Sequence, residues 1–166
     1  NLLGSSDDPT CFAVKNSGEI SMSYVNLKKV ANETYKGAMS AKDISAGFVY
    51  TNSGKIYDAY VQITETGVNN NTFAGFVYQN GGTIERAYSF INGGLKTNNN
   101  DSMFAPAGTK GLIDCIEIVV SGYSNGIESG LSTITPADRY NRSSYEVHNF
   151  AFGDNESAVW KIDASS

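Results

Sequence analysis

Residues 47–56 read GFVYTNSGKI, and residues 75–84 read GFVYQNGGTI, the same pattern after a shift of 28 positions (75 − 47 = 28). The same shift again places Phe104 and Leu112 of residues 103–112, MFAPAGTKGL, on the matching Phe and Ile positions. Residues 11–20, CFAVKNSGEI, form an earlier copy, displaced by 36 positions (47 − 11 = 36). A short fixed period indicates a chain that is built by stacking one unit on the next.

Each copy follows one order of segments: an apolar run led by an aromatic residue, a turn, a second apolar run and a polar spacer. The turns contain Asn and Gly, which tolerate the positive φ that a tight corner needs. The runs are short and rich in Tyr, Val, Ile and Phe, as strands are. The clearest runs are 12–14, 48–50 and 76–78, followed after the turns by 20–27, 56–63 and 84–91. The sequence therefore predicts an all-β fold.

Two arrangements fit this order. If the Asn-Gly positions are hairpin turns, the copies form an antiparallel β-meander or sandwich. If they are corners, each copy is one coil of a right-handed parallel β-helix, a β-solenoid with coils of about 28 residues, and like residues stack in columns. The gapless spacing favours the β-helix. We expect the Phe and Ile columns to form the core and the Asn column to exchange amide hydrogen bonds. The columns are Phe12, Phe48, Phe76 and Phe104; Ile20, Ile56, Ile84 and Leu112; Asn16, Asn52 and Asn80; and Tyr24, Tyr60, Tyr88 and Ile116.

The period divides the chain into two parts. Residues 1–120 are expected to form the repeat solenoid, with copies near 11–27, 47–63, 75–91 and 103–119. Residues 121–166 lose the period, and we expect them to close the solenoid with one or two strands formed by 145–150 and 158–162. The first spacing is 8 residues longer than the second (36 − 28 = 8), which places an insertion at 28–45 that carries four lysines. Such insertions protrude as loops and are often used for recognition.

Composition and charge narrow the classes of partner. The chain has 166 residues and a net charge of −5 spread along its length, which argues against a nucleic-acid partner. No apolar run approaches the roughly 20 residues of a membrane span, so we expect no membrane insertion. Cys11 and Cys115 lie three copies apart, about 14 Å at the spacing of strands, whereas a disulfide needs about 7 Å between Cα atoms. We expect two unpaired thiols, with Cys115 buried in the small-residue column of Ala59 and Ala87.

Candidate chemistry is sparse. His148 is the one histidine, so the sequence offers no histidine-based metal set, and any Ser-His-Asp triad would have to use this residue. We therefore expect no catalytic, cofactor-binding or metal-binding residues. Asp58, Arg86 and Asp114 share one column and form a candidate charge ladder that faces a ligand. Glycan-cleaving enzymes use such clustered carboxylates. Tyr50 and Tyr78 are candidates for stacking against sugar rings.

The two best copies, residues 46–56 and 74–84, resemble the GLUG repeat of bacterial surface and secreted proteins. The family pattern runs Gly, aliphatic, Val, Gly, variable, Asn, Ser or Gly, Gly, variable, Ile. A pair formed by a small residue and Tyr follows, here at 59–60 and 87–88. The chain departs from the pattern where Phe replaces the usual Leu and where Tyr50 and Tyr78 replace the second Gly. The resemblance covers about the first two thirds of the chain. It implies a β-helical spacer or adhesive segment, as found in adhesins, two-partner-secreted proteins and immunoglobulin A peptidases, and it brings no catalytic residues.

These observations predict a non-enzymatic structural or adhesive module of an extracellular or cell-surface bacterial protein. Its partner would be a host protein, a glycan, or another copy of the chain bound end to end in a fibre or filament. The alternatives are a polysaccharide-active enzyme that uses Asp58, Arg86 and Asp114, and a carbohydrate-binding module on the tyrosine face.

Overall fold

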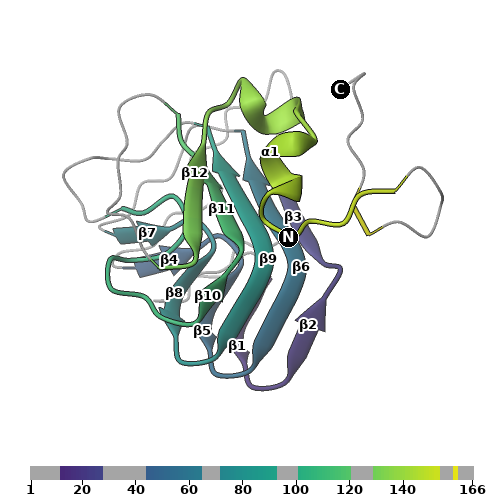
Figure 1. The fold of residues 1–166 in the computed structure, drawn as a ribbon. Helices are drawn as coiled ribbons and strands as arrows, with labels where there is room; N and C mark the ends of the chain where they lie inside the picture. The colour runs from purple at the N-terminus through teal and green to yellow at the C-terminus, as the bar shows by residue number, and fades with distance from the viewer. Residues whose placement is uncertain are drawn as a thin grey trace.

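In the computed structural model of this chain, the structure describes residues 12–27, 44–64, 72–92, 101–120, 129–153 and 159–160. These residues form an all-β fold in which every strand pairing is parallel. Strands of successive copies lie side by side in chain order, from purple to green in Figure 1. The antiparallel meander and sandwich are therefore not the arrangement of the described strands. Most of the insertion expected at 28–45 and most of the Asn-rich spacers lie outside the described residues.

The first runs of the copies form a three-stranded sheet in the order β1-β5-β8. Its strands are β1 (Ala13–Asn16), β5 (Val49–Asn52) and β8 (Val77–Asn80). Asn16 pairs with Asn52, and Asn52 pairs with Asn80. The register therefore absorbs the 36-residue first spacing without a slip, and like residues remain opposite one another.

The second runs form a seven-stranded sheet. Its longest strands, β6 and β9, pair from Lys55↔Thr83 to Ile63↔Ile91. β2 and β3 pair with β6, β10 and β11 pair with β9, and β12 pairs with β11. The bounds are β2 (Glu19–Ser21), β3 (Tyr24–Leu27), β6 (Lys55–Ile63), β9 (Thr83–Ile91), β10 (Leu112–Ile113), β11 (Cys115–Ile118) and β12 (Leu131–Ile134).

A third short strand precedes two of the copies, and the sequence does not predict it. β4 (Ile44–Ala46) pairs with β7 (Thr72–Ala74), and Ala74 forms a parallel bridge to Ser102. These strands of three residues lie immediately before Gly47 and Gly75, and their sequences ISA and TFA are too short to show a strand period. These two copies therefore have three strand segments instead of two.

Each long strand bends at one residue with left-handed backbone. Met22, Asp58, Arg86 and Asp114 occupy the same column and have φ between 46° and 52°. The pairing of β6 with β9 skips Asp58 and Arg86, and the equivalent residues separate β2 from β3 and β10 from β11. Positive φ is uncommon for residues other than Gly, Asn and Asp, and it marks a local bend of the strand here. Because both paired strands bend at equivalent residues, the register on either side of the bend is the same.

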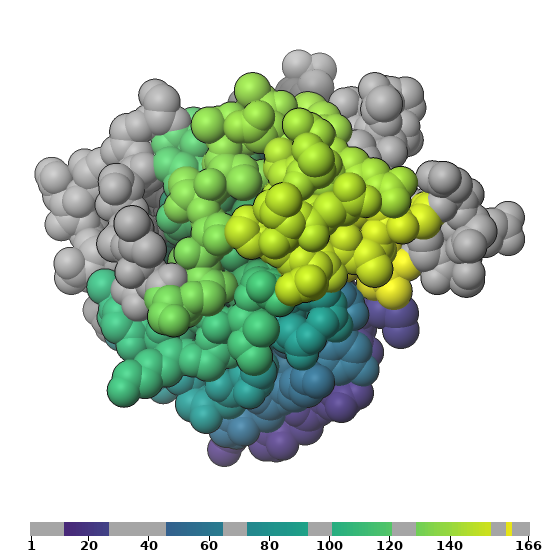
Figure 2. Space-filling view, in the orientation of Figure 1, coloured from purple at the N-terminus to yellow at the C-terminus, as the bar shows by residue number. Residues whose placement is uncertain are grey.

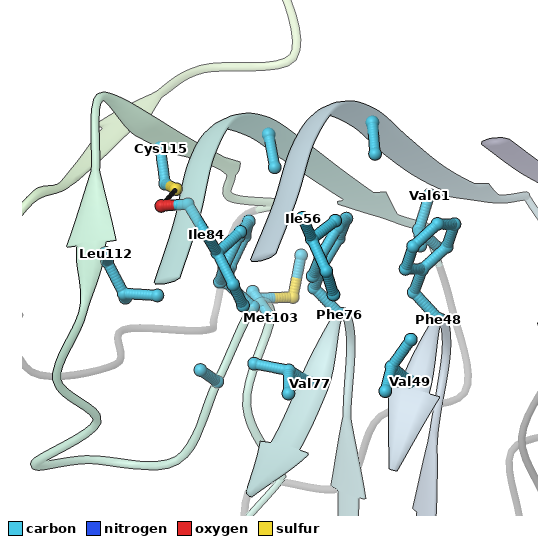
Figure 3. Close-up of a cluster of buried hydrophobic side chains, with 14 of the residues drawn as sticks. Phe48, Val49, Ile56, Val61, Phe76, Val77, Ile84, Met103, Leu112 and Cys115 are labelled. Atoms are coloured by element: carbon cyan, nitrogen blue, oxygen red, sulfur yellow. Dashed lines mark hydrogen bonds between the residues drawn. The ribbon is translucent and has the colours of Figure 1, made fainter. Parts of the chain in front are cut away.

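The main core lies between the two larger sheets and contains the predicted Phe and Ile columns (Figure 3). Phe48, Phe76 and Phe104 are fully buried, as are Ile56 and Ile84. Burying each such side chain contributes roughly 1.5–3 kcal/mol. The first copy differs from this prediction: Phe12 is 46% exposed and Ile20 is only partly buried, because β1 and β2 have a neighbouring described strand on one side only.

The structure of the C-terminal residues differs from the closing strands that the sequence predicts. Residues 145–150 are not a strand: Tyr145 lies in α1 (Ser143–Glu146), which follows the 3-10 helix η1 (Asp138–Tyr140). Of residues 158–162, the structure describes 159–160, where Trp160 forms an isolated bridge to Phe152. The helices of the described parts are too short to cross a membrane.

This C-terminal segment packs on the outer face of the seven-stranded sheet (Figures 1 and 2). Tyr145, Phe150 and Trp160 form a second core with Phe90 and Ile116. The sheet is therefore buried on both faces over β9 and β11. We call the described C-terminal residues, 129–153 and 159–160, the closing segment: its strand β12 extends the sheet, and the rest of it covers the outer face.

Backbone contact between copies requires glycine at the corner. A Cβ atom on Gly82 would lie 2.0 Å from the carbonyl oxygen of Gly54, whereas one on Gly81 would meet nothing closer than 3.8 Å. We expect Gly82→Ala to lower the free energy of unfolding by about 1–3 kcal/mol, because the two neighbouring copies would have to move apart.

Gly81→Ala is the matched control, and we expect it to change stability by less than about 0.5 kcal/mol. Denaturant unfolding of both variants measures the difference. Equal stability of the two variants would contradict the close stacking of the corners.

Candidate functional site

The Asn column forms a continuous hydrogen-bonded ladder at the corner. The Asn16 side-chain amide donates to Asn52 Oδ1 at 2.8 Å, and the Asn52 amide donates to Asn80 Oδ1 at 2.7 Å. Asn16 Oδ1 and Asn52 Oδ1 also accept hydrogen bonds from the backbone N–H groups two residues later, at Gly18 and Gly54. Asn52 is fully buried, so these bonds satisfy a polar group that would otherwise be costly. The predicted amide ladder is confirmed.

Aromatic columns repeat the same spacing. The rings of Phe48 and Phe76 stack at 4.7 Å between centroids, and those of Phe76 and Phe104 also at 4.7 Å. Tyr60 stacks on Tyr24 at 5.0 Å and on Tyr88 at 4.9 Å. Neighbouring strands are separated by about 4.8 Å, so the backbone pairing itself sets these ring distances. The columns are structural contacts.

The three charged residues of the candidate ladder do not act as one group. Arg86 donates to both carboxylate oxygens of Asp58, at 2.8 and 3.1 Å, and also contacts Glu85. Asp114 instead accepts a hydrogen bond of 2.7 Å from Asn149. Among the ion pairs of the described residues, none joins Arg86 to Asp114. The expected ladder is therefore divided, because the closing segment contacts Asp114.

Electrostatics around Arg86 fit a structural ion pair. The hydrogen bond to Asp58 raises the pKa of the guanidinium above its ordinary value. The side chain of Asp58 is 11% exposed and that of Arg86 is 24% exposed, so both are partly withdrawn from solvent. Because Asp58 and Arg86 belong to neighbouring copies, this hydrogen-bonded ion pair stabilises the contact between those copies.

Trp160 attaches the closing segment to the same pair. Its indole N–H donates to Asp58 Oδ1 at 3.2 Å, and its ring lies 5.8 Å from Tyr88 and 6.2 Å from Tyr60. Burial raises the pKa of the Tyr88 hydroxyl, with Tyr145 as a further cause. Sequence reasoning missed Trp160 and Asn149 as partners of the acidic residues, since no local pattern links residues separated by 102 and 35 positions.

Tyr50 and Tyr78 lie on β5 and β8, away from the charged residues. Their ring centroids are 5.1 Å apart and the rings are tilted by 37°. Both side chains are partly buried. Beside them, the Thr51 hydroxyl donates to Gln79 Oε1 at 3.2 Å. Two adjacent tyrosine rings can stack against a sugar ring while their hydroxyl groups bond the hydroxyl groups of the sugar.

Cys115 is a free and fully buried thiol, as expected for its column (Figure 3). Its Sγ donates a weak hydrogen bond to the Ile84 carbonyl oxygen at 3.4 Å. Burial raises the pKa of Cys115 to about 12, so the thiol stays protonated at neutral pH and is a poor nucleophile. Cys11 lies outside the described residues.

His148 lies in the closing segment beside Ser132, with 3.5 Å between Nδ1 and Oγ. Within the described ranges, no group of three or more His, Cys, Asp or Glu side chains could hold a metal ion. The described residues thus combine stacked side-chain columns with a pair of partly buried tyrosine rings on β5 and β8 and with the Asp58–Arg86 ion pair.

Comparison of the chain with protein-family models, with curated proteins and with solved structures gives no match.

The Asp58 contacts give a test of the docked closing segment. We expect Asp58→Asn to lower the free energy of unfolding by about 1–3 kcal/mol, because the neutral amide replaces the carboxylate charge to which Arg86 and Trp160 donate hydrogen bonds. Trp160 is the one tryptophan in the chain, so its fluorescence should shift to longer wavelength as the segment loosens.

Asp138→Asn is the control, since Asp138 is exposed and its carboxylate accepts a hydrogen bond from the Thr135 hydroxyl, three residues earlier. Identical emission and stability of the two variants would show that Asp58 does not hold the closing segment.

Proposed function

We propose that this chain is a right-handed β-solenoid with coils of about 28 residues that serves as a non-enzymatic structural or adhesive module of an extracellular bacterial protein. The observation that carries the proposal is the unbroken parallel register, in which Asn, Phe and Tyr columns run through successive copies. The handedness follows from the strong preference of parallel β connections for the right-handed form.

A scaffold role is supported by where the polar groups are used. The buried Asn amides bond to one another, and the Asp58–Arg86 pair bonds to the closing segment through Trp160. Each copy contacts its neighbours along the stack, so backbone pairing and side-chain ladders resist separation of the coils. The resemblance to the GLUG repeat supports an extracellular setting and a spacer or adhesive role.

The partner is a host protein, a glycan, or a second copy bound at an end of the stack. A glycan is favoured as a second candidate function by the adjacent rings of Tyr50 and Tyr78, which form an amphipathic patch on β5 and β8. The insertion expected at 28–45 lies mostly outside the described residues.

A panel of acidic and neutral polysaccharides tests both roles. Incubated with the full chain, the panel should yield no new reducing or unsaturated ends, because Asp58 is engaged by Arg86 and Trp160. Turnover by the wild-type chain that the Asp114→Asn variant lacks would overturn the scaffold proposal in favour of a polysaccharide-active enzyme.

The same panel, immobilised, tests the tyrosine patch. The Tyr50→Ala/Tyr78→Ala variant should lose retention while remaining folded, because stacking against a sugar ring depends on the two aromatic rings. Tyr140→Ala is the matched control, since Tyr140 is an exposed tyrosine of the closing segment. Retention that both variants preserve equally would exclude the patch as the glycan site.

A further inference from the structure

The two ends of the strand stack differ in what they expose. Phe12 and Tyr24, in the first copy, are 46% and 60% exposed, whereas Phe104 and Ile116, at the last positions of the same columns, are fully buried. Val14 and Met22 add further exposed apolar surface to the first copy. Half of the large exposed hydrophobic side chains of the described residues therefore belong to a single short stretch, 12–24.

This exposure coincides with an open sheet edge. β1 pairs only with β5, and β2 and β3 pair only with β6, among the described strands. The backbone N–H of Ala13 donates to the Phe48 carbonyl oxygen. Successive residues of a parallel strand direct their backbone groups to opposite sides, so the N–H and C=O of Val14 point away from β5. An edge that is both unpaired and apolar is a template for pairing with another chain.

The opposite end is built to avoid such pairing. Its last strand, β12, has four residues and carries Ser132 and Thr133 at its centre. Pro106 occupies the position that corresponds to Tyr50 and Tyr78 in the first-run columns and has no N–H to donate. The Asn column is likewise replaced there, by Gly108. The C-terminal end therefore lacks the Asn and Tyr residues that would continue the columns of the first copy, which argues against head-to-tail growth.

From these differences we infer that the edge formed by β1, β2 and β3 binds the same edge of a second copy of this chain, in a closed two-fold dimer. The inference deepens the proposed function by naming the partner and the end of the stack that binds it, and it rests on the stacked architecture proposed there. A two-fold interface needs only one self-complementary surface, and the stretch that carries the exposed side chains provides it.

Charge on the edge is compatible with self-pairing. The described residues of the first copy, 12–27, carry one cation, Lys15, and one anion, Glu19, while the whole chain has a net charge of −5. Both side chains are exposed. Two copies can therefore approach at this edge without the repulsion that most of the chain would impose, and each Lys15 can face a Glu19 of the partner. The aromatic stacking that joins Phe12 to Phe48 at 4.6 Å leaves the outer ring face of Phe12 available.

Sedimentation velocity of the full chain, under reducing conditions that prevent a disulfide through Cys11, tests the inference. We expect the wild-type chain to form one dimeric species as its concentration rises from the micromolar to the millimolar range. Val14→Lys should raise the dimer dissociation constant by about tenfold or more, because a lysine on an edge strand opposes edge-to-edge pairing. Met22→Lys provides a second variant with an independent position on the same edge.

Val147→Lys is the matched control, since it makes the same change at an exposed valine of the closing segment. We expect it to dimerise as the wild type does. A wild-type chain that stays monomeric throughout, that grows into open-ended oligomers, or that is weakened equally by Val147→Lys and Val14→Lys would overturn the inference. None of these outcomes depends on glycan turnover, so the dimer and the non-enzymatic role fail separately.

Discussion

Parallel pairing between β6 and β9 is the constraint on which the rest of the structure depends. It runs from Lys55↔Thr83 to Ile63↔Ile91 in one register, interrupted only at Asp58 and Arg86. Because neighbouring strands lie about 4.8 Å apart, this register brings like side chains into direct contact. The Asn hydrogen bonds, the stacked phenylalanines and the close approach of Gly82 to Gly54 all follow from it. A slip of one residue would direct every core side chain to the opposite face.

The outer face of the same sheet decides what the charged residues can do. Asp58, Arg86 and Asp114 share the column with positive φ, and the closing segment contacts two of them through Trp160 and Asn149. Residues that in isolation suggest a catalytic cluster thus hold the C-terminal part of the chain on the sheet. The partner surfaces that we propose, the Tyr50 and Tyr78 pair and the edge of the first copy, lie away from these contacts.

The sequence was informative wherever the period is strict. The all-β class, the Phe and Ile core, the Asn ladder and the buried Cys115 could be predicted because residues 28 positions apart become neighbours. Three features could not be predicted. The strands β4 and β7 are too short to show a pattern. α1 replaces an expected strand, because burial of Tyr145 against Tyr88 outweighs the local preference for a strand. The exposure of Phe12 was missed because its position in a column does not reveal that it lies at the end of the stack. The pairing of Asp58 with Trp160 joins residues 102 positions apart, which no local motif records.

The register itself can be measured most directly by nuclear Overhauser effects between backbone protons of the isotopically labelled chain. The account predicts contacts between strands of different copies, at Thr51/Gln79, Ile56/Ile84 and Tyr60/Tyr88. Contacts between α-protons of Thr51 and Lys55, across the corner at Asn52, would instead show an antiparallel hairpin within one copy and would contradict the stacked arrangement.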